Sequence, residues 1–125
     1  MKFTIKKKLD NWNKIIGYAR ANRYLANEKK QDEMDIIKEF LPKEKVKNYP
    51  IKMIFKWHIK SKISDLDNKS TKSILDCMQK EGVIENDNIK YINEIHHIAI
   101  PDKEDYVEVE INDWRRHITI QWINR

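Results

Sequence analysis

The stretch Ile51-Lys52-Met53-Ile54-Phe55-Lys56-Trp57-His58-Ile59 alternates apolar and polar side chains along most of its length. Successive side chains of a β-strand point to opposite faces, so this alternation predicts a strand. One face carries only apolar side chains and is expected to pack on the core: Ile51, Met53, Phe55, Trp57 and Ile59. The other face carries Lys52, Lys56 and His58 beside Ile54. The stretch therefore predicts a strand with one packed face and one basic face.

Two helices are expected around this strand. Residues 69–80 have helical spacing, with Ile74, Leu75 and Met78 as core contacts, and Gly82 supplies a stop. Residues 26–41 also have helical spacing, and Pro42 should end that helix.

Four further regions are expected to form strands. Residues 3–5 form a short one at the start of the chain, and residues 91–100 form an isoleucine-rich one before Pro101. Residues 107–111 and 117–123 are expected to pair as a hairpin. Because the sequence contains no repeat and no linker, the chain is predicted to be one α+β domain, residues 1–125, with a mixed β-sheet packed against two main helices.

Composition sets broad limits on the chain. It has 125 residues, 36% of them charged, and a net charge of +5, which suits either an anionic partner or a solvated surface. The single cysteine, Cys77, excludes an internal disulfide and fits a reducing compartment. No apolar run is long enough for a membrane span or a signal peptide, so a cytoplasmic protein is expected. Two glycines are too few for a nucleotide-binding loop, so no nucleotide cofactor is expected.

Three acids stand out against this basic background. Asp65 and Asp67 lie two residues apart just before the helix predicted over 69–80, and Asp87 follows the Gly82 stop. In an extended segment, the first two would point the same way with backbones about 7 Å apart. Carboxylates suit Mg²⁺, which can activate water and relieve charge on a phosphodiester. Capping of the helix by Asp67 or Asn68, and turn formation by Asp65 and Asp87, explain the same acids. The spacing alone favours this structural explanation over the metal site and leaves both open.

A set of motifs around the acids favours the metal. The motifs are Ser64-Asp65-Leu66-Asp67-Asn68, a helix with Lys72 and Asp76, Gly82-Val83-Ile84, Asn86-Asp87-Asn88-Ile89-Lys90-Tyr91, and residues 13–16 and 20–24 followed by Lys29-Lys30. On these motifs the chain resembles the RusA-like Holliday-junction resolvases, small endonucleases of phage and prophage origin, over roughly residues 3 to 112.

This resemblance implies a site and an activity. Asp65, Asp67 and Asp87 match the family's catalytic acids, which bind Mg²⁺ or Mn²⁺, and Lys72 is the candidate for its catalytic lysine. Two departures stand out: Thr71 occupies the commonest lysine position, which leaves Lys69 as an alternative, and Asn86 replaces the first member of a frequent acid pair.

Basic residues near these acids are candidates for DNA contacts. Lys56, Lys60 and Lys62 lead into Asp65, and Lys69 follows the pair, so they would grip flanking phosphates without reading sequence. Arg20 and Arg23 fall in the matched N-terminal segment. A solvated surface is the alternative for each of them.

His58 is a possible general base. His96 and His97 are neighbours in a predicted strand and so point to opposite faces, which is poor geometry for joint binding of zinc.

The resulting expectation is a Mg²⁺-dependent endodeoxyribonuclease that resolves Holliday junctions by paired symmetric cleavage in DNA recombination and repair. Two symmetric nicks need two active sites, so a homodimer on branched DNA is expected. The alternatives are a nuclease for flaps or other branched DNA, and a non-catalytic protein that binds junction DNA.

Overall fold

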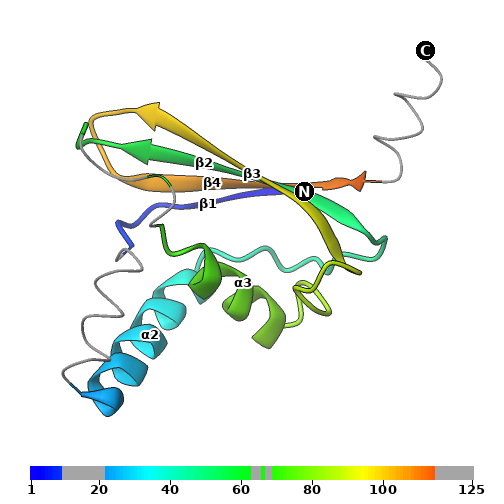
Figure 1. Ribbon diagram of the computed structural model, residues 1–125, viewed down its shortest axis with the longest axis horizontal. Coiled ribbons are helices and arrows are strands. Elements are labelled where there is room, and N and C mark those ends of the chain that lie inside the picture. The colour runs from blue at the N-terminus through cyan, green and yellow to red at the C-terminus, as the bar shows by residue number, and fades with distance from the viewer. Residues whose placement is uncertain (10–21, 63–65, 67–68, 115–125) are drawn as a thin grey trace.

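The computed structural model describes residues 1–9, 22–62, 66 and 69–114 (Figure 1). The elements formed within these residues are, in chain order, β1 (Lys2–Ile5), α2 (Arg23–Lys38), β2 (Ile51–Ile59), α3 (Thr71–Lys80), β3 (Ile92–Pro101) and β4 (Tyr106–Asp113). The strands form a mixed sheet in the order β1-β4-β2-β3, and both helices lie on one side of it. The predicted α+β class, with a mixed sheet and two helices, is confirmed.

Strand β2 is central to the sheet and has the predicted boundaries. It pairs antiparallel with β4 and parallel with β3. Its side chains alternate strictly between buried and half-buried, and Met53 and Phe55 are fully buried. The apolar residues of β1 and β4 continue the buried face: Phe3, Ile5, Val107, Val109 and Ile111. The packed face predicted for residues 51–59 is therefore confirmed.

Helix α3 is the crossover between the parallel strands β2 and β3. Ile74 and Met78 are fully buried, and Leu75 is nearly so, as its spacing predicted. The helix ends at Lys80, and Gly82 follows with a φ of 77°, a left-handed conformation that glycine adopts without a steric penalty. The backbone N–H of Val83 then donates to the carbonyl of Met78 at 2.8 Å, which closes the turn.

Helix α2 begins at Arg23 rather than residue 26 and ends at Lys38 rather than residue 41. The side chain of Asn22 caps its start, because its Oδ1 accepts from the N–H groups of Tyr24 and Leu25. At the other end, a residue that precedes proline disfavours helical backbone, which excludes Leu41 from the helix. Neither helix in the described part of the chain is long and apolar enough to cross a membrane.

The hairpin predicted between residues 107–111 and 117–123 is wrong. Residues 117–123 lie outside the described residues, but β4 is described in full. Its residues 107–110 pair with β1 on one side and with β2 on the other, so both edges of this stretch are occupied. The alternation correctly identified a strand in residues 107–111, but its neighbours come from distant parts of the chain.

Candidate active site

The connection from β2 to α3 carries the first two candidate acids. Asp65 and Asp67 lie outside the described residues, and their predicted roles stay predictions. The connection is anchored at its start, where the backbone N–H of Lys60 donates to Oδ1 of Asp105 at 3.0 Å. It is anchored again at Leu66, which packs half-buried against the core.

The start of α3 bears on whether an acid caps this helix. Its N-cap residue is Ser70, and Thr71 is the first helical residue. The hydroxyl of Ser70 is buried and makes no hydrogen bond to the helix. The N-cap position therefore belongs to Ser70 rather than to Asp67 or Asn68, which lie outside the described residues.

The third acid, Asp87, lies in the loop between α3 and β3. This loop is held by its own side chains: Oδ1 of Asn86 accepts from the N–H groups of Asp87 at 2.7 Å and Asn88 at 3.2 Å. The N–H of Glu85 donates to the hydroxyl of Tyr49 at 3.0 Å. Among the described residues, none makes a hydrogen bond or ion pair with the half-buried carboxylate of Asp87. The loop therefore presents Asp87 as a carboxylate available for a ligand.

The acids border opposite ends of α3. Ser70 precedes the helix, while Asp87 follows it, in the loop that leads from α3 to the start of β3 (Figure 1). A helix of 10 residues spans about 15 Å. Over the described ranges, no group of three His, Cys, Asp or Glu side chains could hold a metal ion. A site with three such ligands would therefore have to include residues outside the described ranges, as Asp65 and Asp67 are.

Lys72, the candidate catalytic lysine, already has an acidic neighbour. Its ammonium lies 3.7 Å from Oδ1 of Asp76, one turn along α3, while the side chain stays 57% exposed. The other oxygen of Asp76 accepts from Lys30 of α2 at 2.7 Å. Such an exposed ion pair is weak, so Lys72 can exchange Asp76 for a phosphate. The alternative, Lys69, is half-buried one residue before the N-cap.

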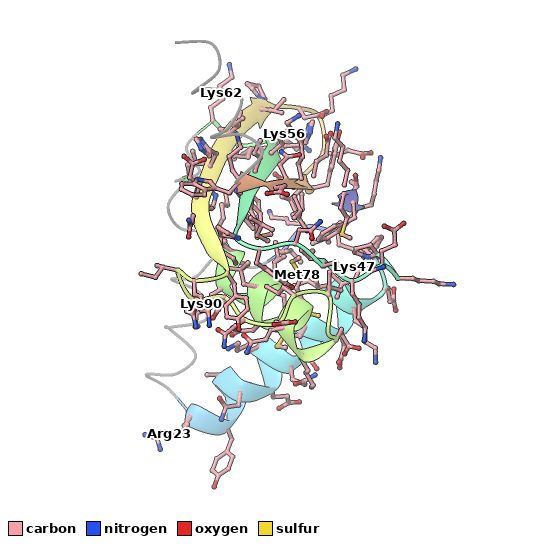
Figure 2. All side chains as sticks on the ribbon, turned by 90° about the vertical axis from the view of Figure 1, so that its right-hand side faces the viewer. Arg23, Lys47, Lys56, Lys62, Met78 and Lys90 are labelled. Carbon is pink, nitrogen blue, oxygen red and sulfur yellow. The ribbon has the colours of Figure 1, made fainter. Side chains whose placement is uncertain are left out.

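The candidate DNA-contacting residues do not form one patch. Figure 2 shows Lys56 and Lys62 near the same end of the molecule, whereas Arg23 lies at the opposite end, at the start of α2. Lys60 is exposed beside the end of β2. Arg20 lies outside the described residues. Of the described candidates, Lys56, Lys60, Lys62 and Lys69 lie nearest to the acid pair in the sequence.

The face of β2 predicted to be basic carries both positive and negative side chains once the sheet has formed. Lys56 lies opposite Glu108 of β4, and its ammonium is 3.7 Å from Glu110. Lys2 of β1 approaches Glu110 from the other side at 3.8 Å. The alternating glutamates of β4 thus offset part of the lysine charge. One strand's alternation identifies the side chains that share a face, but it does not reveal what the neighbouring strand places beside them.

His58 belongs to a cluster that the sequence did not predict. Its Nδ1 lies 2.8 Å from Asp102, and its Nε2 lies 2.8 Å from Glu108. Its ring stacks on Tyr106 at a centroid distance of 4.0 Å. The pKa of Asp102 is lowered, first by the backbone N–H of Lys103 and then by His58. With both ring nitrogens next to carboxylates, His58 ties β2 to β4 and to the β3–β4 turn, and neither nitrogen is open to a substrate.

His97 and Cys77 also have structural surroundings. The indole N–H of Trp57 donates to Nδ1 of His97 at 3.0 Å, and the His97 ring stacks on Phe55. Desolvation lowers the pKa of His97, and neighbouring His96 lowers it further. The thiol of Cys77 is buried and donates to the carbonyl of Met34, and burial raises its pKa to about 11. Cys77 therefore behaves as the small buried residue that its position in a helix suggested.

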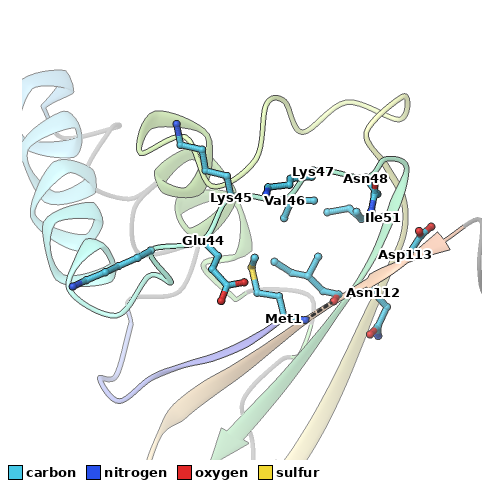
Figure 3. A pocket seen from close by; sticks show the side chains of 11 residues that line it. Met1, Glu44, Lys45, Val46, Lys47, Asn48, Ile51, Asn112 and Asp113 are labelled. Atoms are coloured by element: carbon cyan, nitrogen blue, oxygen red, sulfur yellow. Dashed lines mark hydrogen bonds between the residues drawn. The ribbon is translucent and has the colours of Figure 1, made fainter.

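A cleft lies beside the start of β2, next to the connection from α2 (Figure 3). Its volume is about 600 Å³. Glu44 turns its carboxylate toward Met1, while the ammonium of Lys45 points away. Ile51 and Ile111 add apolar lining. Of the candidate residues that the structure describes, neither Asp87 nor any of the lysines lines this cleft.

Comparison with known proteins adds no family assignment. No family model matches the chain, and no curated protein matches it.

Proposed function

We propose that the chain is a Mg²⁺-dependent endodeoxyribonuclease that resolves four-way DNA junctions by paired symmetric cleavage. The observation that carries the proposal concerns the acids bordering α3. Ser70 rather than Asp67 occupies the N-cap position of α3, and the carboxylate of Asp87 has no protein partner among the described residues. A half-buried carboxylate without a protein partner is what a metal-dependent nuclease needs.

Asp65, Asp67 and Asp87 would hold Mg²⁺, with Mn²⁺ as a substitute. These donor types fit, because Mg²⁺ takes hard oxygen ligands and usually few carboxylates. A shared ion requires the two acids before α3 to reach Asp87, which follows the other end of that helix. When bound, the metal would supply an activated water and relief of charge on the phosphate. Lys72, which is 57% exposed at the start of α3, would contribute a positive charge to the same phosphate.

The substrate of this proposal is branched DNA, and the active form is a homodimer. Lys60 and Lys62 continue from the end of β2 toward Asp65, and Lys69 follows the acid pair, so they would hold phosphates on either side of the cut. Paired nicks in a two-fold junction need two active sites related by the same symmetry. The cellular role would be DNA recombination and repair.

One observation favours a non-catalytic junction-binding protein instead. Asn86 replaces the first acid of the family's frequent pair, and its side-chain oxygen holds the loop through two backbone N–H groups. The loop therefore has a structural role for this position that requires no metal. A nuclease of broader specificity, for flaps or other branches, is a second alternative.

The test is cleavage of labelled four-way junction, flap and linear duplex DNA, each with Mg²⁺, with Mn²⁺ and with EDTA. Asp67→Asn is the test variant, and Asp32→Asn, which removes the same charge from the exposed surface of α2, is its control. The proposal expects paired nicks in the junction with metal, lost in Asp67→Asn and kept in Asp32→Asn. Equal cutting of flaps would favour the broader nuclease. Junction binding without nicks would favour the non-catalytic protein.

A further inference from the structure

The two edge strands of the sheet differ in length and in chemistry. Strand β1 has four residues, begins with Lys2, and is followed by Lys6, Lys7 and Lys8. Strand β3 has ten residues, and β2 is its single strand partner within the described ranges. Edge strands normally avoid pairing with other chains by being short, or by carrying lysine, proline or a bulge. Strand β1 has such protection.

Strand β3 lacks this protection over most of its length. No lysine or proline occurs in residues 92–100, and the irregularity in its pairing with β2 lies at its start. It also exposes apolar side chains on both faces: Ile95 is 41% exposed on the helix side, and Ile98 is 43% exposed on the open side. The central strands β2 and β4, by contrast, bury every second side chain.

We propose that β3 pairs antiparallel with β3 of a second copy of this chain, across a two-fold axis perpendicular to the sheet. The pairing would join two four-stranded sheets into one continuous sheet. The identity of the partner rests on the homodimer of the proposed function, while the surface is inferred from β3 itself.

Charge favours the antiparallel arrangement. In a parallel, in-register pair, Glu94 would face Glu94, which is destabilising. With a two-fold axis at His97, Glu94 faces Ile100 and Ile95 faces Ala99; an axis at His96 sets Glu94 opposite Ile98. Both registers keep every side chain on its own face of the sheet. An axis at Ile98 would bring Glu94 opposite Asp102, whereas His96 and His97 lie at the middle of the strand Ile92–Pro101, so the axis is placed at one of these two residues.

Cross-linking tests the strand and its register together. In such a dimer, only a residue on the axis faces its own copy, so His96→Cys or His97→Cys should form a disulfide-linked dimer in the presence of a mild oxidant. The single native thiol, Cys77, is buried and has a pKa of about 11, so it should not interfere. Lys2→Cys, on the exposed edge strand β1, is the control and should stay monomeric on a denaturing gel.

Sedimentation equilibrium of the full chain supplies the second readout. The wild-type protein should be a dimer, and Ile95→Lys should weaken its binding at least about tenfold. Ile95 is 41% exposed, and it faces Ala99 or His97 in the two registers, so the lysine removes an apolar contact and meets no carboxylate. Thr4→Lys on β1 should leave the dimer intact, and circular dichroism checks that both variants fold.

The outcomes separate this inference from the proposed function. A dimer that is unaffected by Ile95→Lys, with neither cysteine variant cross-linking, would overturn pairing through β3 and would leave the homodimeric nuclease with a different dimer surface. A monomeric wild-type chain would overturn both the pairing and the proposed homodimer, and would leave an extended peptide or residues 115–125 as the candidate occupant of the β3 edge. Junction cleavage, measured separately, tests the enzyme.

Discussion

The two faces of the sheet follow from the sequence in different ways. The helix-covered face is apolar in β1, β2 and β4, and Phe55 and Val109 are almost completely buried there. On the open face, lysines of β1 and β2 meet glutamates of β4, and His58 lies between two carboxylates. Each strand's own alternation determines the first face. The second depends on which strands become neighbours, and in which register.

The largest effect is expected from the covered face. Phe55→Ala removes a fully buried ring that stacks on Trp57 and His97, and should lower the free energy of unfolding by about 3–5 kcal/mol. Urea denaturation measures this change. Ile54→Ala, the neighbouring half-buried residue on the open face, is the control and should cost clearly less. Equal losses would mean that the two faces do not differ in packing.

A smaller loss is expected from the His58 cluster. His58→Ala removes the ring that joins Asp102, Glu108 and Tyr106, so the melting temperature should fall, by less than in Phe55→Ala. The variant should also raise the pKa of Asp102 toward its usual value, since His58 is one cause of its lowering. Titration of the carboxyl by NMR measures this. An unchanged pKa for Asp102 would show that the contact does not persist in solution.

Acid should weaken the fold through His97, at the rim of the covered face. The folded-state pKa of this residue is lowered from 6.5, chiefly by desolvation, so the unfolded chain takes up a proton more readily. Its contribution to stability is complete above pH 6.5 and is lost as the pH falls through the folded-state value. His97→Gln keeps an acceptor for Trp57 and should reduce this pH dependence. Identical dependence in the two proteins would contradict the assignment.

The smallest effect is expected from the lysine–glutamate contacts of the open face. Lys56→Gln should change the free energy of unfolding by about 0–1 kcal/mol, because the Lys56–Glu110 pair at 3.7 Å is only partly shielded from water. Added salt should reduce the difference further. A loss of several kcal/mol would show that the open face is held by this pair. The same variant should weaken DNA binding only if Lys56 contacts phosphate.

Most of the fold could be predicted, because its signals are local. The boundaries of β2 and the stop at Gly82 came directly from alternation and from glycine's backbone freedom. The start of α2 was missed, although Asn22 is a typical capping residue. The hairpin prediction was wrong for a different reason. The edge of β4 is filled by β1, some hundred residues away in the sequence, and no local pattern records that pairing.

The candidate site was harder to predict than the fold. Spacing identified three acids, but it could not show that Ser70 holds the cap position or that Asn86 holds the Asp87 loop. The prediction of a basic strand face left out the glutamates of β4, because they lie 50 or more residues from Lys56 in the sequence. The His58 cluster draws on β2, β4 and the turn before β4, so the sequence gives no local signal for it.

The most direct test of the central claim is Mn²⁺ binding by the full chain, measured by calorimetry in Asp67→Asn, Asp87→Asn and the control Asp32→Asn. The three acids are separated along the chain by α3, so a shared metal is the property that would unite them. The account predicts that both site variants weaken Mn²⁺ binding at least about tenfold, while the control binds as the wild type does. Unchanged binding in both site variants would contradict the account and leave the acids with structural roles.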